Sequence, residues 1–366
     1  MSRSSAVRPE VDARKSSSYM PTLDGWRAIS ILAVMIYHDY LYRAGRFSFQ
    51  WINEHGMVGV DIFFAISGIL ICSRLLAEEQ RFGAIHLGRF YIRRAFRILP
   101  LAILYLLVLA LLSFLAIIPH VGRDWFGALF FFRNYTRLLG THLAGEGSFT
   151  SHFWSLSVEE HFYLLLPALL VLTRRKYRLK VLSGFIVLIA LSLVFQLRHR
   201  QWIYIQHHSD VRLDSLLIPA FIAVLVQRDI VRTWFQRAGH LWPLTLLLLF
   251  GVITWMPKNA GYVLALATLM PVLVLGTVLN PGSLLGRFLE LAPLRFLGRI
   301  SYSLYLWQQL FFIGHLPPEI STLGFLQHGP FNYLAAFACA LASYHLLEKP
   351  AMHFGHRLTN NLNTQS

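Results

Sequence analysis

Apolar stretches long enough, or nearly long enough, to cross a lipid bilayer recur along almost the whole chain. A membrane-spanning helix needs about 20 mostly apolar residues, because lipid cannot hydrogen-bond an exposed backbone. Stretches of this kind lie at approximately 27–43, 58–73, 99–118, 154–172, 181–197, 211–227, 241–256, 260–279, 299–316 and 331–347. The pattern predicts an all-α integral membrane protein, a polytopic bundle of about ten transmembrane helices.

The net charge of +15 has two possible explanations. The basic residues either bind a nucleic acid or another anionic substrate, or they reflect the charge bias that sets the topology of a membrane protein. Their distribution decides between them. If residue 1 is cytoplasmic, most of the 33 Lys and Arg residues fall on cytoplasmic segments, as the positive-inside rule requires. We therefore expect both termini in the cytoplasm, contacts with membrane lipids and no nucleic-acid partner.

The chain divides into one membrane domain, at 21–350, and two short tails. Residues 1–20 are charged and serine-rich and lack an apolar core, which predicts a disordered cytoplasmic tail rather than a signal peptide. Residues 351–366 are expected to form a cytoplasmic C-terminal tail. The long segment 119–153 is rich in aromatic residues, which favours a re-entrant or interfacial helix. Cys72 and Cys339 lie in apolar spans, where we expect packing roles and no disulfide.

Ionisable residues at membrane depth are the main functional candidates, because each costs free energy to insert. His38 follows Arg27 by 11 residues, which places it about 16 Å deeper along the first helix. An imidazole there can remove a proton from a hydroxyl at neutral pH. A histidine hydrogen-bonded inside the bundle for structural reasons is the alternative, and the helix alone does not separate the two.

The second helix begins with Asp61, at a depth comparable with His38. Its carboxylate can orient that imidazole or can stabilise the helix N-terminus. Ser67 and Gly68 follow, and small residues of this kind allow close helix approach. A substrate-contacting or nucleophilic role for Ser67 is the second possibility.

Arginines gather on the cytoplasmic segment that follows. Arg93, Arg94 and Arg97 lie within about one helical turn, with Arg94 and Arg97 on one face. Guanidinium groups bind phosphates in bidentate fashion, so the cluster can hold the phosphates of a nucleotide-bearing donor. Lipid headgroup binding is the alternative.

The fourth and sixth helices each bring charges in from the outer side. Glu159 stands four residues before Tyr163 and five after Trp154, so it can face the bundle while Glu160 faces elsewhere. Arg212 and Asp214 begin the sixth helix, where we expect paired charges near the outer surface. We expect no metal, since no two histidines have ligand spacing on one helix.

In six successive blocks the chain resembles the acyltransferase 3 family of membrane-bound acyltransferases, of the O-antigen acetylase type. The likeness extends from Leu23 to Pro350 and rests on the order and spacing of the blocks more than on any one of them. The blocks are Leu23–Ala28 with His38, Gly59–Leu70, Arg93–Pro100, Trp154–Glu159 with Tyr163 and Pro167, Arg299–Trp307, and Glu348–Pro350.

The resemblance implies transfer of an acyl group, commonly acetyl from acetyl-CoA, to a hydroxyl acceptor at the membrane. It implies that His38 is the essential base, and we expect Asp61 or Glu159 to orient its imidazole. Arg27 and the arginine cluster at 93–97 would bind the acyl-CoA donor. The candidate substrate-binding residues are Ser67, Trp154, Tyr163, Arg212 and Asp214.

The chain departs from the family pattern in two places. Gln308 follows Trp307 where the family often has histidine, so any role of that histidine is absent. Ile218 and Pro219 follow Asp214 where the family often has glycine, and the proline can kink the helix. Some members carry a fused esterase-like domain; we expect none before Ser366, so acceptor specificity should come from the membrane domain.

The expected acceptor is a glycan, a glycolipid or a macrolide-like molecule, and the expected location is the bacterial inner membrane. A transporter or flippase of a lipid-linked sugar is the alternative function, since polar residues can also line a transport path. That function predicts paired helix breaks in two halves of the chain. We find no such symmetry in the sequence.

Overall fold

The computed structural model describes residues 19–43, 51, 55–118, 122, 124–135, 149–200, 205–312 and 324–361, and these residues form helices and no strand. Six helical segments in this part are long and apolar enough to cross a membrane. They are α3 (Val58–Phe82), α4 (Leu87–Phe114), α6 (Phe153–Leu172), α7 (Arg178–His199) with the turn before it, α11 (Asp229–Ala238) continued by α12 (Trp242–Trp255), and α13 (Ala260–Leu279). The predicted all-helical membrane architecture is confirmed to this extent.

Four other predicted spans correspond to helices that are too short, or not apolar enough, to count as membrane-spanning in the same way. Three of the four have only 12 or 13 described residues, whereas the fourth, α1, has 23 residues but carries several charged groups. They are α1 (Pro21–Arg43), α10 (Asp214–Leu225), α16 (Ser301–Phe312) and α17 (Phe331–Ser343). The count of about ten spans therefore stays a prediction.

Helix α3 lies at the centre of the bundle. In its apolar window 72% of the residues are buried, whereas in those of α7 and of α11–α12 only 11% are, so these helices lie at the periphery of the bundle. Two glycines let neighbouring helices approach α3 closely. A Cβ at Gly59 would meet the Ser30 carbonyl of α1, and one at Gly68 would meet the Leu216 carbonyl and the Pro219 ring of α10. The expected close approach at Gly68 is confirmed.

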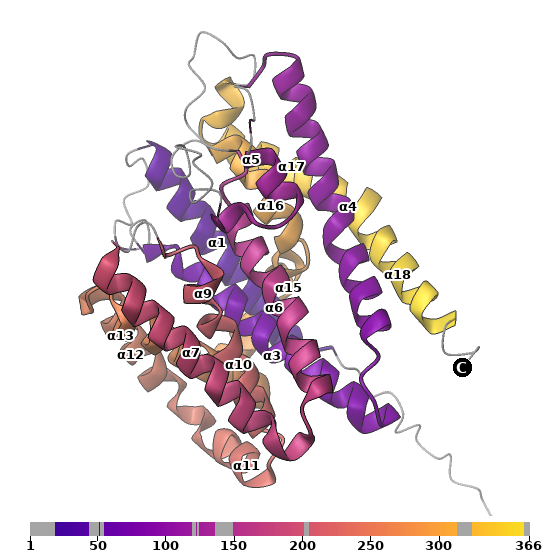
Figure 1. Cartoon of the computed structure of the whole chain (residues 1–366). Helices are drawn as coiled ribbons and strands as arrows, with labels where there is room; N and C mark the ends of the chain where they lie inside the picture. Colours follow the sequence, from indigo (N-terminus) through magenta and orange to yellow (C-terminus); the bar gives the residue numbers. More distant parts are fainter. Residues whose placement is uncertain are drawn as a thin grey trace, which may run out of the picture.

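Shorter helices complete the fold. In Figure 1, α7, α12 and α13 lie on one side of the bundle and α4 with α18 on the other. A π-helical segment, Tyr344–Glu348, joins α17 to α18, and the Gly355 backbone of α18 packs on Phe96 of α4. The short helices are α5 (Asp124–Leu129), α9 (Ser209–Arg212), α14 (Leu284–Leu289), α15 (Ala292–Arg299) and α18 (Lys349–Asn361).

Three segments predicted as tails or connections can be compared with this structure. Most of the predicted tail at 1–20 lies outside the described residues. Of the predicted C-terminal tail, residues 351–361 belong to α18. In the aromatic segment 119–153, the described part contains the six-residue helix α5 and a short turn at 133–135, and residues 136–148 lie outside the described part.

Candidate active site

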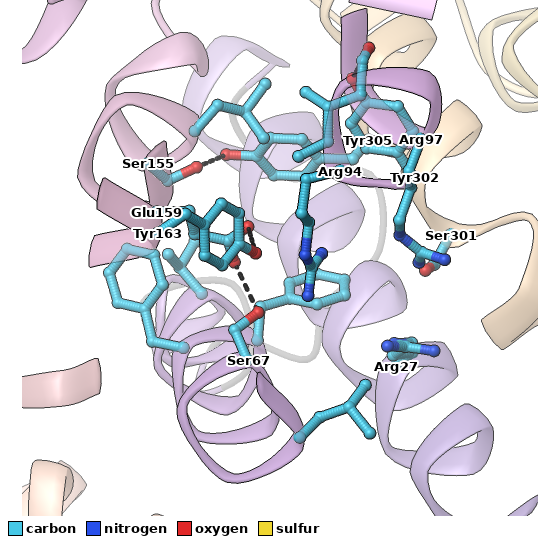
Figure 2. Close-up of a pocket in the computed structure, with 16 residues that line it drawn as sticks. Arg27, Ser67, Arg94, Arg97, Ser155, Glu159, Tyr163, Ser301, Tyr302 and Tyr305 are labelled. Atoms are coloured by element: carbon cyan, nitrogen blue, oxygen red, sulfur yellow. Dashed lines mark hydrogen bonds between the residues drawn. The ribbon is translucent and has the colours of Figure 1, made fainter. Parts of the chain in front are cut away.

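A cavity of about 720 Å³ lies between α1, α3, α4, α6 and α16 (Figure 2). We call it the arginine pocket, because the side chains of Arg27, Arg94 and Arg97 line it. Its other polar lining residues are Ser67, Ser155, Glu159, Tyr163, Ser301, Tyr302 and Tyr305. The pocket therefore collects several predicted site residues from four separate stretches of sequence.

The spacing of Arg94 and Arg97 on α4 turns both side chains into the pocket, as predicted. The guanidinium carbon of Arg94 lies 4.3 Å from the ring centroid of Tyr163 on α6, which is a cation–π contact. From α1, Arg27 places Nη1 3.2 Å from Asp24 Oδ1. Clustered guanidinium groups in a confined space suit a phosphate-bearing ligand.

Arg93, predicted to share this cluster, is not among the described residues that line the pocket. Its Nη2 atom instead lies 3.6 Å from Glu78 Oε2 on α3. Attraction to this carboxylate therefore accounts for its position. Arg74 of α3, which the sequence did not single out, adds its charge to those of Arg94 and Arg97.

Glu159 lies in the pocket wall and is held by two hydroxyl groups. Ser67 donates to Glu159 Oε1 at 3.0 Å, and Tyr163 donates to Oε2 at 2.9 Å (Figure 2). The expected orientation of Glu159 toward the bundle is confirmed. Because Ser67 donates to this carboxylate, the structure connects α3 with α6 at the centre of the pocket.

His38 is half-buried on α1 and its Nδ1 atom lies 2.9 Å from Oε1 of Gln308 on α16. We expected Asp61 or Glu159 to orient this imidazole. Neither carboxylate makes a hydrogen bond to His38 among the described contacts, since Asp61 binds Arg212 and Glu159 binds two hydroxyls. Gln308 is the residue that contacts and can orient the His38 imidazole. This is the position where many family members have a histidine, whose role we expected to be absent.

His38 is not among the described lining residues of the arginine pocket, but Tyr305, which lines it, lies on the same helix as Gln308. Tyr305 and Ser155 both line the pocket, and their oxygens are 2.6 Å apart (Figure 2). Tyr305 also donates to the backbone carbonyl of His152 at 3.1 Å. Because Tyr305 precedes Gln308 by one turn of α16, His38 lies about one helical turn beyond this end of the pocket.

A second cavity, of about 600 Å³, opens beside the first. We call it the Trp154 pocket. Both cavities are lined by residues from the first turns of α3, whereas on α1 the first is lined by Arg27 and the second by Tyr37, the chain neighbour of His38. The lining residues are Tyr37, His55, Met57, Val58, Asp61, Trp154, Gln206, Arg212, Lys258 and Tyr262.

Asp61 and Arg212 form a buried ion pair in the wall of the Trp154 pocket. We had expected Arg212 to pair with Asp214 near the surface. Residues two apart on a helix do not face one another, so Arg212 reaches α3 while Asp214 is fully buried and accepts from the Ser215 backbone N–H at 2.7 Å. The pair therefore ties α9 to the start of α3.

Phe64 separates the two pockets. Its ring lines the arginine pocket and makes an edge contact with Trp154, at a centroid distance of 6.0 Å. The guanidinium carbon of Arg212 lies 5.7 Å from the same ring. Trp154 and Arg212 both belong to the other pocket, so one aromatic ring stands between the two cavities.

Four residues of the site received no role from the sequence. Tyr305 and Tyr302 stand three residues apart in the block Arg299–Trp307, and this spacing could have marked a common face. Lys258 and Gln308 carry no such signal. Their positions depend on contacts between distant segments.

Comparison with known proteins gives this helical membrane protein a family. The model of a family described as an acyltransferase domain matches residues 20–344. The O-acetyltransferase OatA of Staphylococcus aureus strain NCTC 8325 / PS 47 is 32% identical over 319 residues, which cover 80% of this chain and 50% of OatA. A relative from strain MSSA476, provisionally named an O-acetyltransferase, has the same identity over 317 residues and the same coverage. No solved structure gives a significant match.

The fold and these matches define a membrane-bound acyltransferase. The chain belongs to the acyltransferase 3 family, as the six sequence blocks predicted. It spans about half the length of the curated relatives it matches.

Proposed function

We propose that this protein transfers an acyl group, acetyl in the first instance, from acyl-CoA to a hydroxyl of a cell-envelope glycan. A glycolipid or a macrolide-like molecule would offer the same hydroxyl chemistry. The observation that carries the proposal is the arginine pocket, which ends about one helical turn from an oriented, half-buried histidine. A donor with phosphates at one end and a thioester at the other matches this arrangement.

The donor phosphates bind Arg94 and Arg97, with Arg27 as the third cation of the wall. The thioester then extends along α3 toward Tyr305 and His38. The hydroxyls of Ser155 and Tyr305 line this route, and Ser155 can donate to the thioester carbonyl in place of its present contact with Tyr305, whose own proton is donated to the His152 carbonyl. The side chains at the two ends of the pocket therefore have different tasks, binding at one end and chemistry at the other.

The acceptor enters through the Trp154 pocket, whose wall of aromatic and polar side chains suits a sugar. His38 takes the proton of the acceptor hydroxyl while its oxygen attacks the thioester carbonyl carbon. The carbon–sulfur bond breaks, and the thiolate receives the proton from the imidazolium. The products are the acylated acceptor and free CoA, and His38 returns to its neutral form.

The topology that we propose has about ten spans, with both termini and the arginine pocket on the cytoplasmic side, where acyl-CoA is available. The positive-inside distribution of Lys and Arg supports this orientation. The Trp154 pocket then faces the outside of a bacterial inner membrane. An acyl group would cross only the distance between the two pockets.

The test is acceptor-dependent release of free CoA from acetyl-CoA, by membranes with equal amounts of wild type or His38→Ala and a pooled glycan acceptor. We expect loss of acceptor-dependent turnover in the variant. His328→Ala is the matched control, because His328 is exposed and bonds the Gly324 carbonyl at 2.7 Å. Equal rates for wild type and His38→Ala would reject the histidine as the base.

The alternative function, a transporter or flippase of a lipid-linked sugar, gives a different result in the same membranes. It predicts movement of a labelled lipid-linked sugar across the bilayer with no release of CoA. Movement of this kind, unchanged in His38→Ala, would favour the transporter.

A further inference from the structure

Gln308 lies where the proposed base must be oriented. It is fully buried on α16, and its Oε1 atom is 2.9 Å from Nδ1 of His38 on α1. Helices α1 and α16 pack against each other, so the contact is built into the bundle. A glutamine at this depth is costly unless its amide is hydrogen-bonded at both ends.

The orientation of the Gln308 amide is fixed by its other contacts. Its Nε2 atom lies 3.4 Å from the Tyr305 carbonyl oxygen and 3.4 Å from Gln309 Oε1, and both of these atoms only accept hydrogen bonds. Gln309 Nε2 in turn lies 2.6 Å from Ser151 Oγ, a hydroxyl that can donate or accept, so the Tyr305 carbonyl is the contact that decides the orientation. A flipped Gln308 amide would set its oxygen against this carbonyl oxygen. The carbonyl oxygen of Gln308 therefore faces His38.

An amide oxygen can only accept, so the Nδ1 atom of His38 must carry a proton to bond it. In the neutral ring the lone pair is then on Nε2. We propose that Gln308 is a positioning residue that holds His38 in the Nδ1–H tautomer and thereby assigns proton abstraction to Nε2. This inference rests on the proposed function for the role of His38 as the base.

The transfer step then uses each ring nitrogen for one purpose. The acceptor O–H proton moves to Nε2 while the oxygen forms a bond to the thioester carbon and the carbon–sulfur bond breaks. The imidazolium ring carries two N–H groups at this moment, and Gln308 Oε1 still accepts from Nδ1. The proton on Nε2 then passes to the thiolate, so the imidazole does not have to flip during the catalytic cycle.

The experiment compares substitutions at Gln308 that keep or remove a hydrogen-bond acceptor. Gln308→Met has nearly the same volume but no comparable acceptor, whereas Gln308→Glu and Gln308→His each present one. We expect kcat for acetyl-CoA-dependent acyl transfer to fall by roughly a hundredfold in the Met variant with an unchanged KM for acetyl-CoA. We expect the Glu and His variants to stay within about tenfold of wild type.

Gln327→Met is the matched control. Gln327 is also buried and its Nε2 donates to the Leu310 carbonyl at 3.2 Å, so the substitution removes a buried amide away from His38. A role limited to filling space would reverse the pattern, with Met tolerated best and His worst. That result, with His38→Ala still inactive, would overturn the role of Gln308 and leave the proposed function intact.

A second measurement does not depend on turnover. The nitrogen NMR shifts of ¹⁵N-histidine-labelled protein report which ring nitrogen is protonated, and His38→Ala identifies the signal. We expect the Nδ1–H tautomer in wild type and a mixture of tautomers in Gln308→Met. An Nε2–H tautomer in wild type would overturn the inference whether or not an acceptor has been found.

Discussion

The arginine pocket and the Trp154 pocket share walls from α3 and α6, yet their charges are balanced differently. Among the described lining residues, the arginine pocket has three guanidinium groups and one carboxylate, Glu159, whose oxygens already accept from two hydroxyls. In the Trp154 pocket the carboxylate of Asp61 is bound directly to Arg212. The first cavity keeps the charges of Arg94 and Arg97 available for an anion, whereas in the second the Asp61 and Arg212 charges neutralise each other and Lys258 is the remaining cation among the described lining residues.

This difference indicates what each cavity can recognise. Available guanidinium groups favour a polyanion such as the phosphates of CoA. A wall of aromatic rings and polar groups, in which the one carboxylate is paired with Arg212, favours a ligand that is rich in hydroxyls. A single chain can therefore bind two dissimilar substrates in two cavities that meet at the Phe64 ring.

The largest effect is expected on stability, when the buried Asp61–Arg212 ion pair in the wall of the Trp154 pocket loses its carboxylate. Asp61→Asn leaves Arg212 buried without its counter-ion, which should lower the free energy of unfolding by about 3–5 kcal/mol. The double variant Asp61→Leu with Arg212→Met removes both charges and should recover most of this loss. Thermal unfolding of the detergent-solubilised protein measures both, and a double variant no more stable than the single one would contradict the ion-pair account.

The next effect concerns the available charges of the arginine pocket. Arg94→Gln should raise the KM for acetyl-CoA by roughly ten- to a hundredfold with little change in kcat, because a charge-assisted hydrogen bond contributes about 1.5–3 kcal/mol. Arg93→Gln is the control, since Arg93 pairs with Glu78 outside the pocket. Equal KM changes in the two variants would mean that the whole cluster acts as a diffuse charge.

The smallest effect is expected at the ring that separates the cavities. Phe64→Ala should extend the arginine pocket at the thioester end and raise the rate with butyryl-CoA relative to acetyl-CoA by roughly tenfold, because added methylenes are each worth about 1–3 kcal/mol in a fitting pocket. Competition between the two donors measures the ratio. An unchanged ratio would show that Phe64 does not limit the length of the acyl group.

Features that depend on local spacing could be predicted from the sequence. The three-residue interval between Arg94 and Arg97 and the place of Glu159 one turn before Tyr163 fix which side chains share a face, whatever the rest of the fold does. The apolar stretches likewise predicted a helical membrane protein, because lipid leaves the backbone few alternatives. These parts of the site follow from helix geometry.

Features that depend on pairing between distant helices could not be predicted. The sequence offered His38 as a partner for Asp61 and Asp214 as a partner for Arg212. In the structure the Arg212 side chain reaches from α9 to Asp61 on α3, so the two residues pair with each other. Gln308 could be compared only with a family pattern, and its hydrogen bond to His38 spans 270 residues of sequence. Such contacts are decided by which helices become neighbours.

The Asp61–Arg212 pair also has a consequence for how the protein is made. The two residues are 151 positions apart, so at roughly 5–20 residues per second the ribosome needs about 8–30 s to supply the arginine after the aspartate. During that interval α3 carries a carboxylate without its counter-ion. Asp61 stands in the first turn of α3, so its insertion costs less than the about 2.5–3.5 kcal/mol of a charge at a helix centre, and the strongly apolar remainder of α3 offsets this cost alone. The link between the start of α3 and α9 can thus form only late in synthesis, when Arg212 emerges.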